Sequence, residues 1–233
     1  MVLSGIIFTF KYGGTEMVFS GILLFLQFIL ALFIGESITN KRRFIEIICY
    51  LSMPMIAVGA YQFLSGQKTS ALWLASSETG ITTRSFAFFT SPNILGATLV
   101  FIIIMTLALF IKKRNYLLLF ISFTAFIVLG FTFSRSAWLA LLVSFLVIAL
   151  AYNWKILLAS PLVSLFFLIP QIRNRFLNIF TNSYIVDSSI DGRIWSINNG
   201  LHIFSKNILL GTGPGTYGGL LARSYSSPIY LEG

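Results

Sequence analysis

Long, continuously apolar runs dominate this sequence and limit what it can fold into. The candidate membrane-spanning runs lie at 17–35, 44–64, 93–111, 116–132, 136–152 and 156–170, and residues 1–10 form part of a further one. A helix needs about 20 apolar residues to cross a bilayer, whereas the strands of a membrane barrel alternate apolar and polar residues. We therefore expect an all-α fold, a polytopic integral membrane helical bundle of about 6–7 transmembrane helices.

The composition and the placement of charge exclude other broad classes. Hydrophobic residues make up 57% of the 233 residues and charged residues only 10%, well below the quarter or so that is charged in soluble domains. The net charge of +9 is spread in twos and threes between apolar runs and forms no basic stripe, which argues against nucleic-acid binding. The sequence therefore predicts a multi-pass protein of the cell (plasma or inner) membrane, with membrane lipids around it.

The short connectors between spans predict the orientation. The cation-rich turns KRR (41–43), KKR (112–114) and NWK (153–155) alternate along the chain and would lie on the cytoplasmic side. Loop 65–92, the turn at 133–135 and the segment 171–233 would then lie outside. We expect 1–170 to be the transmembrane region and 171–233 an outer-face loop segment.

The outer segment is more polar and contains one amphipathic pattern. Apolar residues recur at Ile194, Ile197, Leu201 and Phe204. This is helical spacing, and Asp191 is placed to cap the helix at its N-terminus. We expect an amphipathic helix that lies on or near the outer membrane surface.

Arg135 interrupts the most apolar part of the chain. The run 116–130 makes only about 22 Å of helix, so the helix must continue to about residue 134 to reach the interface. Arg135 would then lie in a tight hairpin at the outer interface. Two interpretations stay open on this residue alone: an anchoring arginine beside Trp138, or a cation that holds an anionic substrate.

Two further arginines lie on the same predicted face. Arg84 precedes the SPN turn before the span 93–111, and Arg193 begins the amphipathic helix. Each taken singly is typical of a solvated surface charge. Together with Arg135 they suit a pyrophosphate, because guanidinium groups bind phosphate oxygens through paired, charge-assisted hydrogen bonds.

Other candidate sites are weaker. GTGPGTYGG (211–219) follows a helix rather than a strand, so it indicates a tight turn and not a nucleotide loop. His202 is interpreted as a helix-surface histidine. One histidine and one cysteine, Cys49, make no metal-ligand set, so no metal or other cofactor is expected. Glu36 and Glu46 flank the KRR turn and are expected to pair with it.

Three segments together resemble a known family. In order, RSFAFFTSPNILGATLV, FTFSRSAWLALLVSFLV and GRIWSINNGLHIFSKNILLGTGPGTYGG look like the O-antigen ligase and O-antigen polymerase family, over roughly residues 80 to 220. The resemblance implies an integral membrane glycosyltransferase of cell-surface polysaccharide assembly. Such enzymes pass a glycan from an undecaprenyl-pyrophosphate carrier to a lipid or polysaccharide acceptor at the outer face, without a metal. By motif, Arg84, Arg135 and Arg193 would bind the carrier pyrophosphate.

The sequence also departs from the family pattern. Family members carry a histidine downstream of the glycine turn, proposed to activate the acceptor, and further spans after that loop. The sequence has neither, and His202 lies too early to match. The expectation is a truncated member whose catalytic residue is unknown.

The sequence leaves two alternatives from other functional classes open. The arginines could line the path of a transporter for a lipid-linked sugar or an anion, or the chain could be an inactive fragment. Transporters tend to show charges or broken helices near the middle of the membrane. Here the arginines gather at one predicted face, which favours the transferase.

Overall fold

The structure is a computed structural model of the 233-residue chain. It describes residues 19–20, 22–23, 26–69, 82–151, 170–177, 181–182, 185–186, 189, 193–208, 211–212 and 217. The chain divides into two compact units, which we describe separately. The central unit is Asn40–Tyr184, and the terminal unit combines Met1–Thr39 with Ile185–Gly233.

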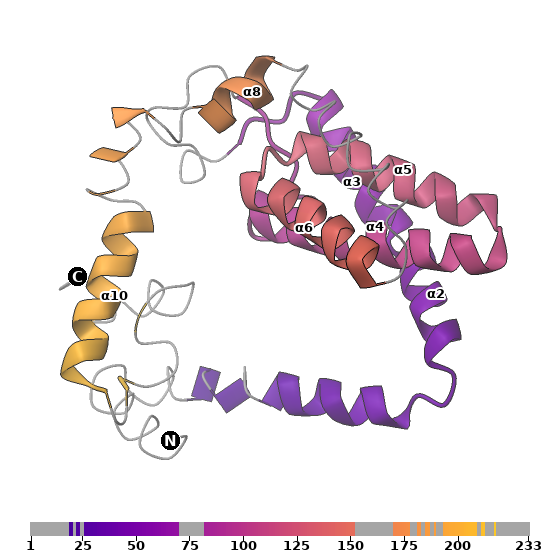
Figure 1. The fold of residues 1–233 in the computed structure, drawn as a ribbon, viewed down its shortest axis with the longest axis horizontal. Helices are drawn as coiled ribbons and strands as arrows, with labels where there is room; N and C mark the ends of the chain where they lie inside the picture. Colours follow the sequence, from indigo (N-terminus) through magenta and orange to yellow (C-terminus); the bar gives the residue numbers. More distant parts are fainter. Residues whose placement is uncertain are drawn as a thin grey trace. The chain divides into compact units, whose positions relative to one another are not determined.

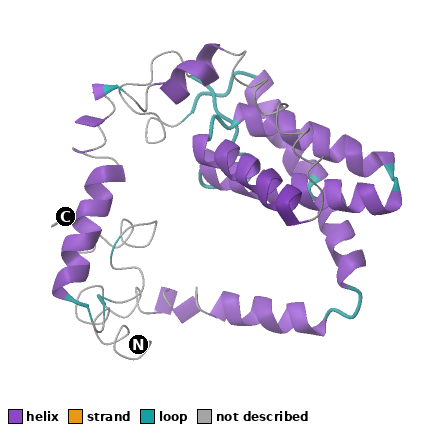
Figure 2. Cartoon of the chain, in the orientation of Figure 1, coloured by secondary structure: helices purple, strands orange, loops and turns teal. Residues whose placement is uncertain are grey.

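The described residues are helical. The helices are α2 (Lys41–Leu51), α3 (Met53–Leu64), α4 (Pro92–Lys113), α5 (Tyr116–Phe131), α6 (Arg135–Ala151), α8 (Pro170–Leu177) and α10 (Arg193–Lys206), drawn in Figure 1. Within the described residues the β-pairing is limited to one isolated bridge, between Lys68 and Thr83, and Figure 2 shows no strand. The all-α expectation is confirmed.

Two helical stretches are long and apolar enough to cross a membrane, Lys41–Leu64 and Pro92–Lys113. They match the predicted spans 44–64 and 93–111. The predicted spans 17–35, 116–132 and 136–152 correspond to the shorter apolar helices Leu26–Ser37, Tyr116–Phe131 and Arg135–Ala151. Residues 1–10 and 156–169 lie outside the described residues, so the number of six or seven spans stays a prediction.

Caps set the boundaries of α4 and α5. The Ser91 side chain accepts a hydrogen bond from the backbone N–H of Ile94, and Pro92 occupies the first turn of α4, where a missing N–H costs nothing. Arg114 ends α4 in the left-handed region (φ 54°), and Asn115 caps α5 by accepting from Leu117 N. Only two residues, Arg114 and Asn115, therefore connect α4 to α5.

The core of the central unit lies between α3, α4, α5 and α6. Leu95, Leu99 and Ile103 of α4 are almost fully buried in one apolar cluster with residues of α5 and α6. Two glycines allow the close approaches. A Cβ on Gly59 would lie 2.9 Å from Val128 Cγ1, and a Cβ on Gly96 would lie 2.9 Å from Ala137 Cβ. Small residues at such contacts are typical of helix packing in membranes.

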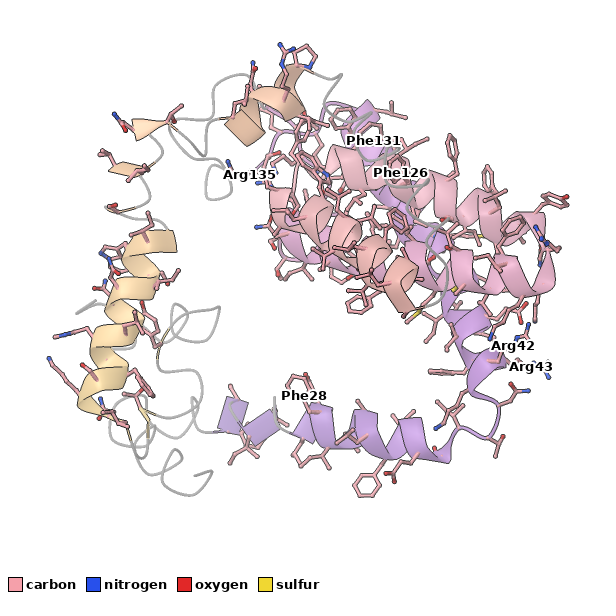
Figure 3. All side chains as sticks on the ribbon, viewed as in Figure 1. Phe28, Arg42, Arg43, Phe126, Phe131 and Arg135 are labelled. Atoms are coloured by element: carbon pink, nitrogen blue, oxygen red, sulfur yellow. The ribbon has the colours of Figure 1, made fainter. Side chains whose placement is uncertain are left out.

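The two cation-rich turns meet at one end of the central unit. Glu46 of α2 forms an ion pair with Lys113, and Asn115 Nδ2 donates to Tyr50 Oη at 3.0 Å. The sequence predicted a partner in the KRR turn; Arg42 of that turn acts on Glu46 through its charge, but the ion pair itself is with Lys113. Its partner belongs to the KKR turn, because Cys49 of α2 packs against Leu109 and Leu118. Figure 3 shows Arg42 and Arg43 on α2, and Arg135 at the other end of the unit.

Candidate functional site

The turn between α5 and α6 is short and buried. α5 ends at Phe131 and α6 begins at Arg135, and the three residues between them are buried: Thr132, Phe133 and Ser134. The tight hairpin is confirmed, although α5 stops about one turn earlier than the sequence predicted. Thr132 ends it there, since its hydroxyl donates to Leu129 O at 2.7 Å and accepts from Ser134 N at 3.2 Å.

The turn presents Arg135 at the N-terminus of α6. Ser134 O accepts the N–H groups of Ala137 (3.1 Å) and Trp138 (3.2 Å), so Ser134 is the last residue before the helix. Arg135 is half-buried, and Figure 3 shows it at the end of the unit away from Arg42 and Arg43. A helix N-terminus carries partial positive charge, which adds to that of the guanidinium.

Arg84 is attached to this same turn. Its side chain is only 2% exposed, so it is not the solvated loop arginine that the sequence alone favoured. The Nε atom donates to Thr132 O at 3.0 Å, and Nη2 donates to Asn93 Oδ1 at 3.3 Å. Arg84 and Arg135 are about fifty residues apart in the sequence. In the structure Arg84 is bonded to Thr132, which precedes Arg135 by three residues.

The segment that carries Arg84 is held by buried polar groups. Ser85 donates its N–H to Phe131 O (3.0 Å) and its hydroxyl to Gly59 O (2.6 Å). Gln62 of α3 accepts from Phe86 N and Ala87 N at 3.1 and 2.7 Å, and donates to Ala87 O at 3.1 Å. Sequence reasoning missed Gln62. The signal was a lone amide side chain within the apolar run 44–64, since polar groups inside spans need partners.

An apolar pocket of about 400 Å³ lies between α3 and α5. Its lining includes the first and last residues of α3, Met53 and Leu64, and reaches Phe131 at the end of α5. The ring of Phe131 stacks on that of Phe63 with centroids 4.0 Å apart. One end of this pocket therefore lies beside the turn that precedes Arg135.

Arg193 lies in the terminal unit, as the first residue of α10. A helix over the predicted segment is confirmed as Arg193–Lys206, with Ile197, Leu201 and Phe204 about 60% exposed; its place on the outer membrane surface stays a prediction. Asp191, its predicted cap, and the side chain of Arg193 lie outside the described residues. His202 is exposed on the helix, as expected.

Two described residues of the segment 211–219, Gly211 and Tyr217, bear on the glycine-rich turn. Gly211 adopts a positive φ of 66°, which agrees with the tight-turn interpretation. Tyr217 Oη donates to Ser196 O at 2.6 Å, and a Cβ on Gly200 would lie 3.2 Å from Tyr217 Cε1. Tyr217 thus rests against the first turns of α10.

Comparison with known proteins gives one family. Residues 120–232 match the family model described as O-antigen ligase. Among curated proteins and among solved structures, none matches the chain. The matched range begins later than the resemblance at residue 80; it includes Arg135 and Arg193 but not Arg84. Residues 120–232 of this chain are therefore similar to the O-antigen ligase family, and this match supports membership of that family.

Proposed function

We propose that this protein takes part in cell-surface polysaccharide assembly by transferring a glycan from an undecaprenyl-pyrophosphate carrier to a lipid or glycan acceptor. The O-antigen ligase family is embedded in membranes and acts on lipid-linked glycans and their acceptors. The transfer would occur at the outer face of the plasma membrane. Arg135, with Arg84 beside it in the central unit, would bind the pyrophosphate of the carrier; for Arg193 of the terminal unit the same role stays a prediction from the sequence.

The observation that carries this proposal is the attachment of Arg84 to the turn before Arg135. A cation costs least in a membrane protein when it lies near an interface or faces a polar site. Here one buried arginine fixes the carbonyl of Thr132, and a second arginine follows at the start of α6. Two guanidinium groups and a helix N-terminus form a fixed positive environment for a phosphate.

The apolar pocket suits the other part of the carrier. An undecaprenyl pyrophosphate joins a long hydrocarbon tail to an anionic head. The pocket between α3 and α5 extends along the 12 residues of α3, roughly 18 Å, and one end lies beside the Thr132 turn. A tail in this pocket would bring its head to Arg135.

The chemistry needs no oxidation or reduction. The acceptor hydroxyl oxygen attacks the anomeric carbon of the glycan, and the bond from that carbon to the phosphate oxygen breaks. The electron pair leaves with the pyrophosphate, and the acceptor proton passes to a general base. Fixed cations would stabilise the charge on the departing pyrophosphate.

The test is glycan transfer in proteoliposomes with the intact gene product, a lipid-linked glycan donor and the acceptor. Arg135→Ala is expected to lower the transfer rate at least about 100-fold, since it removes a charge-assisted contact to the leaving group. Arg135→Lys should lose less, because lysine keeps the charge but not the bidentate geometry. Arg43→Ala, which removes an exposed arginine at the other end of the unit, is the matched control. Equal transfer by Arg135→Ala and the control would refute the site.

A further inference from the structure

Gln62 of α3 is a buried polar side chain with several hydrogen bonds to the segment that carries Arg84. It is 6% exposed, and three hydrogen bonds join it to residues 86 and 87. An amide that binds both the N–H and the C=O of one residue fixes that residue's backbone. The residue is Ala87, whose φ of 49° lies in the left-handed region, which alanine adopts at a cost of about 1–2 kcal/mol. Gln62 therefore holds the segment in a conformation that the segment would not favour alone.

The fixed segment continues directly to Arg84. Ser85 is fully buried and is bonded to Gly59 O and Phe131 O, one from each of the helices that flank the segment. With residues 85–87 held in this way, the backbone of Arg84 has a defined position. Arg84 Nε can then reach Thr132 O at 3.0 Å.

The last step leads from Thr132 to Arg135. Phe133 has a positive φ of 51°, so this turn also adopts a backbone conformation that a bulky residue rarely takes. Two hydrogen bonds hold the turn in that conformation: Arg84 Nε donates to Thr132 O, and Ser134 N donates to the Thr132 hydroxyl. Together they set the direction in which α6 begins. The placement of Arg135 thus depends on a chain of hydrogen bonds that starts on α3.

We propose that Gln62 is a positioning residue for Arg135, acting through the segment 84–87 and Arg84. The role rests on the proposed function, since it concerns how the pyrophosphate ligand is held. It goes beyond that function because Gln62 contacts no substrate. A residue with a merely architectural role would stabilise the bundle and have no specific link to Arg135.

A double-mutant cycle separates the two roles. The measurement is the affinity of the purified intact protein for undecaprenyl pyrophosphate in detergent micelles, by microscale thermophoresis. Gln62→Leu should weaken binding about tenfold when Arg135 is present, and change it less than about twofold when Arg135→Ala is already in place. Thr106→Val is the matched control, because its buried hydroxyl bonds only to its own helix, at Ile102 O and Ile103 O.

The outcomes are distinguishable. An equal loss in both backgrounds, or no loss in Gln62→Leu, would overturn the positioning role while leaving Arg135 as a ligand. Unchanged binding in Arg135→Ala would overturn the proposed site and the positioning role with it. Should Gln62→Leu fail to fold, Ser85→Ala removes a different contact of the same segment, the bond to Gly59 O, and is judged by the same cycle.

Discussion

At the residue scale, the burial of Arg84 changes its interpretation from a solvated charge to a structural side chain. From sequence it was a charge in an outer loop. In the structure it is 2% exposed and donates to Thr132 O and Asn93 Oδ1. Buried arginines of this kind persist only when their N–H groups are bonded. Its position beside the Arg135 turn is therefore part of the fold.

Loss of Arg84 should destabilise the turn. In Arg84→Ala, the carbonyl of Thr132 loses a charged donor, at a cost of about 1–3 kcal/mol, so the midpoint of thermal unfolding in detergent should fall by several degrees. Arg43→Ala, an exposed arginine, should leave the midpoint unchanged. A midpoint in Arg84→Ala equal to that of the control would show that the Thr132 contact contributes nothing.

Sequence could identify Arg135 but not Gln62. The position of Arg135 followed from local information, namely span lengths on either side of one charge. The role of Gln62 depends on contacts with residues 24 and 25 positions away, across a loop whose path no local pattern specifies. The pairing of Glu46 with Lys113 was missed for the same reason, since 67 positions separate them.

At the element scale, α4 and α6 meet closely because of a glycine. A Cβ on Gly96 would lie 2.9 Å from Ala137 Cβ and 3.1 Å from Ser134 Cβ. Gly96→Ala should therefore force α6 away and cost about 1–3 kcal/mol of stability, with a loss of transfer. Gly35→Ala is the matched control, since nothing lies within 4 Å of its Cβ position. Identical unfolding midpoints in the two variants would contradict the close contact.

Tyr217 should stabilise the start of α10. Tyr217→Phe removes the hydrogen bond to Ser196 O, worth about 1 kcal/mol, so amide exchange in α10 should be roughly fivefold faster. Hydrogen–deuterium exchange with mass spectrometry measures this, with Tyr61→Phe, an exposed tyrosine of α3, as the control. Unchanged exchange in Tyr217→Phe would mean that Tyr217 does not hold α10.

The helices themselves were largely predictable. Continuous apolar runs predicted α4, α6 and the start of α5 to within about two residues, because these boundaries lie at capping residues or turns. The early end of α5 was not foreseen. It depends on the Thr132 hydroxyl, whose partners become clear only when the turn is folded.

At the scale of the whole molecule, the ion pair between Glu46 and Lys113 joins the KRR-bearing helix to the KKR turn. Connectors after alternate spans must lie on one side of the membrane, and this pairing agrees with that requirement. Arg135 lies at the other end of the central unit (Figure 3). We propose that this end faces outward.

Cysteine labelling tests that orientation. In a Cys49→Ser background, an impermeant thiol reagent applied to intact cells should label Arg173→Cys but not Lys112→Cys, both of which replace exposed residues. Inverted vesicles should give the reverse pattern. Labelling of Arg173→Cys from the cytoplasmic side alone would invert the proposed orientation.

The most direct test of the proposed pyrophosphate site is whether Arg135 gives the protein its preference for a pyrophosphate head. The measurement is the ratio of affinities for undecaprenyl pyrophosphate and undecaprenol, which share a tail and differ in charge. The wild-type protein and Arg43→Ala should prefer the pyrophosphate by about 10- to 100-fold, and Arg135→Ala should lose most of that preference. A preference that survives intact in Arg135→Ala would show that Arg135 does not bind the pyrophosphate.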